Sequence, residues 1–176
     1  MFKRLFGVNP AKEAGRALYS TCVAHARQPI FYAEWQVPDT VEGRFEIYAL
    51  HVILVLDRLK AHGDQASETG QALFDSLLRG LDDGLREMGV GDLSVGKKMR
   101  KLGEALYGRA KNASAALSLL PDVTDLEAFL KRTVYADTPD ADASALTQWV
   151  VKAHAALAGQ DIATILAGDV AFAEKN

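Results

Sequence analysis

The segment from Gly91 to Lys98, Gly-Asp-Leu-Ser-Val-Gly-Lys-Lys, nearly matches the glycine-rich loop with which many ATPases bind phosphate. That loop needs a serine or threonine after its lysine, because the hydroxyl coordinates the Mg²⁺ ion that bridges the phosphates. Lys98 occupies this position and cannot coordinate a cation. The loop must also follow a β-strand, whereas residues 73–88 repeat apolar side chains with a helical period. The segment therefore does not indicate nucleotide hydrolysis.

A second group that could do chemistry is the acidic cluster of Asp82, Asp83 and Glu87. Carboxylate metal sites in helical bundles need several acidic residues or histidines that converge from other helices. The rest of the chain offers no second cluster of this kind, and one cysteine with four scattered histidines does not favour a zinc site. Since no Ser/His/Asp arrangement is present either, we expect a protein that is not an enzyme and that carries no metal or cofactor.

The composition is that of one soluble globular domain. The chain has 176 residues, 49% of them hydrophobic, a single cysteine and a formal net charge of −3. This charge excludes a strongly basic protein that coats nucleic acids, and we do not expect DNA binding. A lone Cys22 cannot form an internal disulfide, which favours a reducing, cytoplasmic location. No apolar run reaches the roughly 20 residues that span a bilayer.

The first residues allow two interpretations: a frayed terminus, or a weak membrane-surface anchor with apolar and basic side chains. The residues concerned are Phe2, Lys3, Arg4, Leu5 and Phe6.

Hydrophobic periodicity predicts an all-α, single-domain helical bundle of about seven helices. Four longer helices are expected over about 10–27, 41–62, 67–88 and 95–120, and three shorter ones from about residues 124, 143 and 162. The expected N-caps are Asn9, Thr40, Ser94, Thr124 (with a capping box to Glu127) and Asp161. We place the central helical domain at residues 29–158, with residues 1–28 before it and 159–176 after it.

Two features of this pattern could mark a contact surface. Residues 28–39 are predicted to be an extended connection whose aromatic side chains no helix stripe needs for its core; these are Phe31, Tyr32 and Trp35. Several glycines fall within predicted helices, where each costs about 0.5–1 kcal/mol relative to alanine. We expect close helix contacts there, within the domain or with a partner, at Gly80, Gly84, Gly96, Gly103 and Gly108.

Residues 97–111 form a basic segment in an otherwise acidic chain. Six basic residues and one glutamate give it a net charge of +5: Lys97, Lys98, Arg100, Lys101, Arg109 and Lys111 against Glu104. Lys97 and Lys98 fall in the first turn of the predicted helix, where the helix dipole disfavours cations. The segment favours an acidic partner: phosphate, ribosomal RNA, anionic lipid or a carboxylate-rich protein. The alternative is a solvated helix face in which Arg100 pairs with Glu104.

Arg44, His51 and Arg58 recur every seven residues and so share one side of the helix predicted over 41–62. If this helix and the next form an antiparallel hairpin, Arg44 lies near Asp83 and Glu87, and we predict that it pairs there as a buried tie. His51 stands among apolar residues, which favours a hydrogen-bonded core histidine over a site residue.

Taken together, two stretches of the chain resemble the ubiquinol–cytochrome c chaperone family, whose members assist biogenesis of the cytochrome bc1 complex. The similarity covers about residues 29–157. Its matching residues are Val37-Pro38-Asp39-Thr40, Gly43-Arg44-Phe45-Glu46, Leu50-His51, Asp57-Arg58-Leu59, Asp82, Leu85-Arg86-Glu87-Met88-Gly89-Val90-Gly91-Asp92, Val95-Gly96-Lys97-Lys98-Met99 and Tyr107-Gly108-Arg109.

The resemblance implies an α-helical, non-enzymatic assembly factor that acts on newly made cytochrome b. Mitochondrial members of the family work with a small partner protein near the ribosomal tunnel exit. The absence of a mitochondrial targeting segment suits a bacterial relative in the cytoplasm or at the inner face of the membrane. The surface expected to meet client or partner comprises Phe31, Tyr32, Trp35, Val90, Asp92, Lys97, Lys98, Arg100 and Lys101. The alternative is a general adaptor that docks on ribosomal RNA or anionic membrane through residues 97–111.

Overall fold

The computed structural model describes residues 9–173 of the chain, so the apolar and basic residues at positions 2–6 lie outside the described part. Over this range there are eight helices and no strand, which confirms the predicted all-α fold. The helices are α1 (Pro10–Ala26), α2 (Pro29–Ala33), α3 (Val41–Leu59), α4 (Asp64–Glu87), α5 (Asp92–Leu117), α6 (Thr124–Thr133), α7 (Ser144–Ala158) and α8 (Ile162–Leu166). None of the described helices is both long and apolar enough to cross a bilayer.

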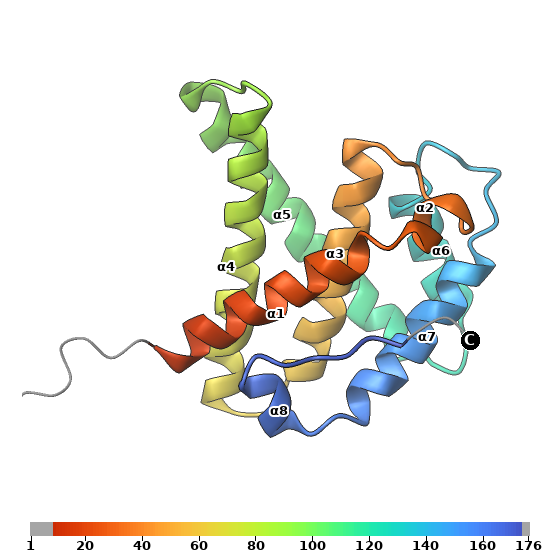
Figure 1. Ribbon diagram of the computed structural model, residues 1–176. Helices are drawn as coiled ribbons and strands as arrows, with labels where there is room; N and C mark the ends of the chain where they lie inside the picture. Colours follow the sequence, from red (N-terminus) through yellow and green to blue (C-terminus); the bar gives the residue numbers. More distant parts are fainter. Residues whose placement is uncertain (1–8, 174–176) are drawn as a thin grey trace, which may run out of the picture.

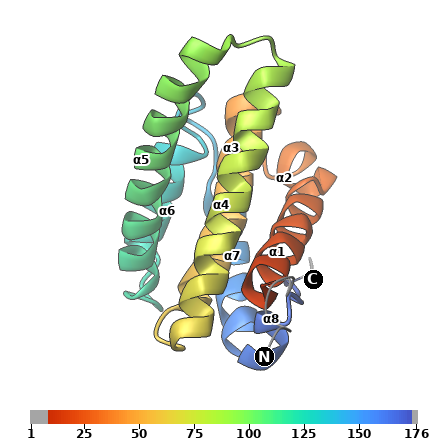
Figure 2. The same ribbon diagram turned by 90° about the vertical axis from the view of Figure 1, so that its left-hand side faces the viewer.

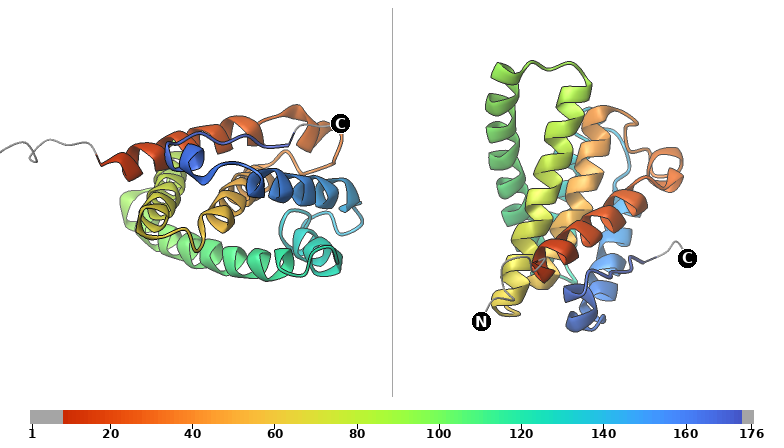
Figure 3. Two further views of the ribbon diagram at one scale, coloured as in Figure 1. Left: turned by 90° about the horizontal axis from the view of Figure 1, so that it is seen from below. Right: turned by 60° about the vertical axis from the view of Figure 1, so that its left-hand side comes forward.

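The bundle is built around α3. The seven consecutive residues from Ala49 to Val55 are all buried, because α1, α4, α5 and α7 all pack against this helix. Figure 1 shows α1 crossing α3 and α4, while Figure 2 shows α4 and α5 side by side as a long hairpin. The short α8 contacts α1, which brings the C-terminal part of the chain back onto the first helix (Figure 3).

Three of the predicted helix starts are confirmed by their hydrogen bonds. The side chains of Asn9, Thr40 and Asp161 accept from the backbone N–H groups of Ala11 (2.9 Å), Gly43 (3.1 Å) and Ala163 (3.2 Å). These oxygens satisfy donors that the first turn of a helix leaves unpaired.

The other two predicted N-caps are wrong. Ser94 lies inside α5, which begins at Asp92 after the N-cap Gly91. Thr124 is the first residue of α6, and its backbone N–H donates to the carboxylate of Asp122 (2.9 Å). Gly91, three residues before Ser94, and Asp122, two residues before Thr124, allow these helices to begin earlier than predicted.

The prediction of an extended segment over residues 28–39 is also wrong at its start, because Pro29–Ala33 form the short helix α2. A proline at the first helical position has the required φ, and the Ile30 carbonyl accepts from the N–H groups of Glu34 (3.1 Å) and Trp35 (3.0 Å). This turn directs Phe31 into the core, where its side chain is fully buried. The expectation that all three aromatic side chains of this segment lie free of the core is therefore wrong.

The other two aromatic residues of the segment are half-buried. The ring of Trp35 meets that of Phe31 edge to face, with centroids 5.1 Å apart. Tyr32 donates its hydroxyl to the carbonyl of Ala26 (2.9 Å), and burial raises its pKa to about 12. The segment thus closes one end of the core and leaves only parts of two rings at the surface.

The apolar stripe of α4 leaves the core toward the end of the helix. Leu73 and Leu77 are buried, Leu81 and Leu85 are half-buried, and Met88 is 56% exposed. The end of α4 and the start of α5 extend past the start of α3, as Figures 1 and 2 show. The hairpin tip therefore exposes Met88 and parts of Leu81 and Leu85 among charged side chains.

The glycines of this hairpin have different surroundings. A Cβ added to Gly80 would lie 2.1 Å from the hydroxyl oxygen of Tyr19, so α1 and α4 approach closely at this residue. The other four positions leave open space: no atom lies within 4 Å of a Cβ built on Gly84, Gly96, Gly103 or Gly108. Internal packing explains Gly80 but not these four.

Candidate functional site

The basic segment of α5 presents four exposed cations. The exposed residues are Lys97, Lys98, Arg100 and Lys101. None of them forms an ion pair within residues 9–173, and Arg100 does not pair with Glu104. Because α5 begins at Asp92, Lys97 and Lys98 are its sixth and seventh residues. The expectation that they lie in the first turn is therefore wrong, and the cost from the helix dipole is small, since that effect falls off within one turn.

Arg109 does not belong to this exposed surface. Its guanidinium donates twice to Glu46 on α3, from Nε to Oε2 (2.7 Å) and from Nη2 to Oε1 (2.5 Å). The side chains are only 25% and 11% exposed. The sequence could not separate this structural arginine from the free ones, because its partner is 63 residues away.

The hairpin tip next to the basic segment begins with a helix C-cap. Gly89 has φ +80°, and the N–H groups of Gly89 and Val90 donate to the carbonyls of Arg86 (2.9 Å) and Leu85 (3.1 Å). Val90 is half-buried and Asp92 is exposed. Arg86 pairs with Asp82 at 2.8 Å and also with Asp92, which ties the two arms of the hairpin.

The predicted tie between Arg44 and the end of α4 is absent. Arg44 pairs with Asp39 at 2.6 Å and is 43% exposed, so it is neither buried nor bonded to Asp83 or Glu87. Those two carboxylates are exposed and belong to the last two turns of α4, which extend beyond the start of α3 (Figure 1). A helix of 24 residues outruns its partner of 19 in an antiparallel hairpin, so the register moves them out of reach.

The other two residues on this side of α3, His51 and Arg58, have structural roles. His51 is completely buried; its Nδ1 donates to the Ile47 carbonyl (2.8 Å), so its Nε2 accepts from Nδ1 of His25 (2.9 Å). Burial lowers the pKa of His51 to about 3 and keeps it neutral. The interpretation as a hydrogen-bonded core histidine is confirmed.

Arg58 donates to the carbonyls of Leu157 (2.8 Å) and Gln160 (2.9 Å), and so binds the C-terminal end of α7.

A polar network that the sequence did not reveal joins α3 to α5 and α7. The half-buried carboxylate of Asp57 accepts from Ser114 Oγ and Lys60 Nζ (both 2.8 Å), and His154 Nε2 lies 3.4 Å from its other oxygen. Burial raises the pKa of Asp57, but the hydrogen bonds and nearby cations outweigh it and hold the pKa below its ordinary value. The network fixes three helices around the start of the α3–α4 turn.

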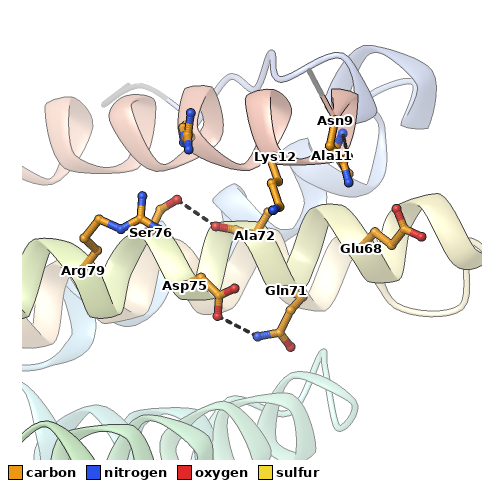
Figure 4. Close-up of a pocket in the computed structure, with 10 residues that line it drawn as sticks. Asn9, Ala11, Lys12, Glu68, Gln71, Ala72, Asp75, Ser76 and Arg79 are labelled. Atoms are coloured by element: carbon orange, nitrogen blue, oxygen red, sulfur yellow. Dashed lines mark hydrogen bonds between the residues drawn. The ribbon is translucent and has the colours of Figure 1, made fainter. Parts of the chain in front are cut away.

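Two hollows flank α4. The first, of about 370 Å³, lies between α1 and α4 and contains both cations and carboxylates (Figure 4). Its charged residues are Lys12, Arg16, Arg79, Glu68 and Asp75. Asp75 accepts a hydrogen bond from Gln71 (2.8 Å), as the dashed line in Figure 4 marks. Such mixed charges do not select one ligand chemistry.

The second hollow is a larger groove of about 500 Å³ whose walls are α3, α4 and α5. Its apolar surface comes from Leu56, Leu59, Ala66, Phe74, Tyr107 and Ala110. Tyr107 is 73% exposed, the most exposed large apolar side chain among the described residues. The prediction did not include this residue in the surface, although it belongs to one of the segments that carry the resemblance.

Comparison with known proteins agrees with this architecture. A crystal structure of the Cbp3 homolog from Brucella abortus is similar to the chain with a TM-score of 0.83 and 35% sequence identity, covering 93% of this chain and 91% of that one. Ubiquinol-cytochrome-c reductase complex assembly factor 1 of Xenopus laevis is 25% identical over 96 residues, which are 54% of this chain and 48% of that protein. The match thus spans about half the length of the frog relative.

The family model described as ubiquinol-cytochrome C chaperone matches residues 33–172, from the end of α2 to the C-terminal part of the described chain. This range includes both segments that carry the resemblance, the α4–α5 hairpin and the groove beside it. With this match over most of its length, the chain belongs to the ubiquinol-cytochrome c chaperone family.

Proposed function

We propose that the protein is a non-enzymatic assembly chaperone for the cytochrome bc1 complex, respiratory complex III, and that it binds newly made cytochrome b. The observation that carries the proposal is the family match over residues 33–172. The similarity to a reductase complex assembly factor and to the Cbp3 homolog supports it.

The tip of the α4–α5 hairpin is the surface that we propose for the client. A newly made membrane protein exposes apolar helices that water disfavours, so a chaperone must offer apolar surface in return. Met88 is 56% exposed, and Leu81, Leu85 and Val90 are accessible in part. The unbranched methionine adapts to clients of different shape.

The exposed cations of α5 would border this apolar tip and select what approaches it. Lys97, Lys98, Arg100 and Lys101 have no ion-pair partner within the described residues, so their charge is available to a partner. We propose that they contact acidic loops of the client, a small partner protein or the ribosome. The buried Phe31 is not part of this proposed surface, and Tyr32 and Trp35 could contribute only their exposed edges.

Deletion of the gene tests the function. We expect the b- and c1-type haem signals of the bc1 complex to fall together in reduced-minus-oxidised spectra of membranes, while cytochromes of other complexes persist. The gene carried on a plasmid restores both signals. Unchanged bc1 levels in the deletion strain would disprove the chaperone role.

A general adaptor remains the second candidate, because the same cations suit any polyanion. It would dock on ribosomal RNA or on the anionic inner face of a bacterial membrane through residues 97–111, with no preference for cytochrome b. Such binding weakens steeply with salt, since each neutralised phosphate releases counterions. Binding to ribosomes or to vesicles with anionic lipid that disappears between 50 and 300 mM salt, in a strain with normal bc1 levels, would favour the adaptor.

A further inference from the structure

The last described residues form an extended segment that returns over the bundle. Residues 169–173, which we call the C-terminal strap, follow α8 and run past α1 to α7, as Figures 1 and 3 show. The turn before them is tight: Gly168 has φ +96°, and a Cβ built on it would lie 3.1 Å from Cα of Ala14 on α1. A left-handed glycine in close contact with α1 therefore fixes where the strap begins.

Side chains of the strap alternate between the core and the solvent. Val170 and Phe172 are buried, at 5% and 8% exposure, whereas Asp169 and Ala171 are exposed. A period of two is that of an extended chain, whose successive side chains point to opposite sides. The strap thus presents every second side chain to the body of the protein, as a bound peptide does.

Side chains of the body, rather than a neighbouring strand, hold the backbone of the strap. The amide of Gln160 pairs with Ala171 in both directions: Nε2 donates to the Ala171 carbonyl (2.8 Å), and Oε1 accepts from its N–H (2.9 Å). The indole Nε1 of Trp149 donates to the carbonyl of Ala173 (3.1 Å). Main-chain hydrogen bonds of this kind hold any extended sequence and leave the choice of sequence to the side-chain pockets.

Aromatic rings from three helices form the pocket that holds Phe172, which we call the Phe172 pocket. The ring centroid of Phe172 lies 4.9 Å from that of His25 on α1 and 4.8 Å from that of His51 on α3. Trp149 on α7 contributes a third ring, 6.4 Å away. Ring pairs at these separations are worth more than the burial of their area, so the pocket favours an aromatic side chain over an aliphatic one.

Two residues by which the chain resembles its family build this site. His51 packs against Phe172, and Arg58 donates to the backbone carbonyl of Gln160 (2.9 Å), which positions the amide that holds the strap. The family match itself ends at Phe172. Neither His51 nor Arg58 belongs to the hairpin tip, so this site accounts for a part of the resemblance that the tip does not.

Few contacts hold the strap in its site. Within residues 9–173 no backbone–backbone hydrogen bond reaches residues 170–173, and the strap follows the last described helix. Three hydrogen bonds from side chains and two buried side chains must offset the conformational entropy lost in ordering the strap. Such segments near a chain end open more readily than packed helices.

We propose that the strap is an intramolecular peptide ligand, and that the Phe172 pocket together with Gln160 binds an extended client segment of the pattern apolar–any–aromatic when the strap leaves. A helical segment cannot bind in this way, because residues i and i+2 of a helix point to different faces. The proposal rests on the proposed function, since an assembly chaperone meets chains whose helices have not yet formed. The strap keeps this second client site covered until such a segment displaces it.

A synthetic peptide with the sequence of residues 167–176 tests the site on the full-length protein. In the wild type the tethered strap competes with the peptide, whereas Phe172→Ala weakens the strap and leaves the site intact. By fluorescence anisotropy we expect the labelled peptide to bind Phe172→Ala at least about tenfold tighter than the wild type. Ala171→Pro should give a similar gain, because proline lacks the N–H that Gln160 accepts and the exposed Ala171 is not part of the core.

Two control peptides test the sequence pattern. In one, alanine replaces the phenylalanine; in the other, the residues that correspond to Val170 and Ala171 are exchanged, which keeps the composition and breaks the alternation. Both should bind Phe172→Ala at least about tenfold more weakly than the strap peptide does. Adding Gln160→Ala to Phe172→Ala should also weaken binding of the strap peptide, because it removes two main-chain hydrogen bonds.

Phe129→Ala is the matched control variant, since Phe129 is also buried, at 4% exposure, but belongs to α6 and not to the site. Circular dichroism shows that the variants compared are folded. Binding of the strap peptide to neither strap variant, or equally to Phe129→Ala, would overturn the proposal. So would a wild-type dimer in sedimentation velocity that Phe172→Ala abolishes, because the ligand would then be the strap of a second copy.

The peptide assay uses purified protein, and its result does not depend on bc1 levels in the deletion strain. Loss of bc1 in that strain without peptide binding would refute the strap site alone, whereas peptide binding with normal bc1 levels would refute the chaperone role alone.

Discussion

Arg109 on α5 holds Glu46 on α3 through two parallel hydrogen bonds of 2.7 and 2.5 Å. Each residue lies in one of the segments by which the sequence resembles its family, Gly43–Glu46 and Tyr107–Arg109. The pair therefore explains part of that resemblance as a structural link: it fixes the arm of the hairpin that carries both the basic segment and Tyr107 to the central helix of the bundle.

Replacing Arg109 by alanine leaves Glu46, only 11% exposed, without its partner. We expect a loss of about 2 kcal/mol in the free energy of unfolding, measured by urea denaturation. Arg109→Lys should restore only part of it, because an ammonium group cannot make the two-pronged contact. Arg44→Ala is the control: its pair with Asp39 is exposed, and its removal should change stability by less than about 0.5 kcal/mol. Equal effects of the two alanine variants would contradict this assignment.

Gly43 must remain a glycine, whereas Gly84 need not. A Cβ on Gly43 would lie 2.0 Å from the carbonyl oxygen of Pro38, and backbone cannot move aside as a side-chain tip can. We expect Gly43→Ala to destabilise the protein by about 2 kcal/mol. Gly84→Ala, with nothing within 4 Å, should stabilise it by about 0.5–1 kcal/mol, since alanine is the better helix former. Thermal unfolding of the two variants measures both shifts, which should have opposite signs.

His51 should make the protein less stable in mild acid. Its pKa is about 3 in the folded protein and 6.5 when unfolded, so between these values only the unfolded chain takes up the proton. Stability should therefore fall by about 1.4 kcal/mol per pH unit as the pH drops below 6. His51→Gln should remove this contribution from the urea midpoint measured between pH 7 and pH 4. In the NMR spectrum of the wild type, a His51 ring resonance that titrates near pH 6.5 would refute the prediction.

Asp57 acts in a lower pH range. The pKa of Asp57 lies below its ordinary value of 3.8 because the folded protein stabilises the carboxylate. The stability that this carboxylate contributes is therefore complete above about pH 4. This contribution is lost as the pH falls through the lowered pKa. Asp57→Asn should lower stability at pH 7 and flatten its decline below pH 4. Ser118→Ala is the control: this exposed serine bonds to the Ala115 carbonyl and not to Asp57, so the pH profile should stay unchanged.

Reversing the charge of the basic segment tests its part in the proposed function. The fourfold variant Lys97→Glu, Lys98→Glu, Arg100→Glu and Lys101→Glu should keep its helix content and lose most crosslinking to client, partner or ribosome, because all four side chains are exposed.

A control for this variant reverses four exposed cations elsewhere, Lys12, Arg16, Arg132 and Lys152, and so changes the net charge equally. Crosslink yields that match the wild type in the first variant, or that fall equally in both, would remove the segment from the interface.

The sequence alone determined the helical architecture, because an apolar period of 3.6 residues and three side-chain caps at Asn9, Thr40 and Asp161 are local properties. It also predicted the buried state of His51 from its apolar neighbours and, through its motifs, the family. These features depend on residues close together in the chain.

Tertiary structure decided which of the charged and aromatic residues remain at the surface. Arg109 is bound to a residue 63 positions away, Arg44 misses Asp83 because α4 outruns α3, and Phe31 turns inward because α2 forms beside Trp149. The apolar groove beside Tyr107 likewise takes its lining from three helices that are distant in the sequence. Register and packing angles between helices set these contacts, and local sequence patterns do not encode them.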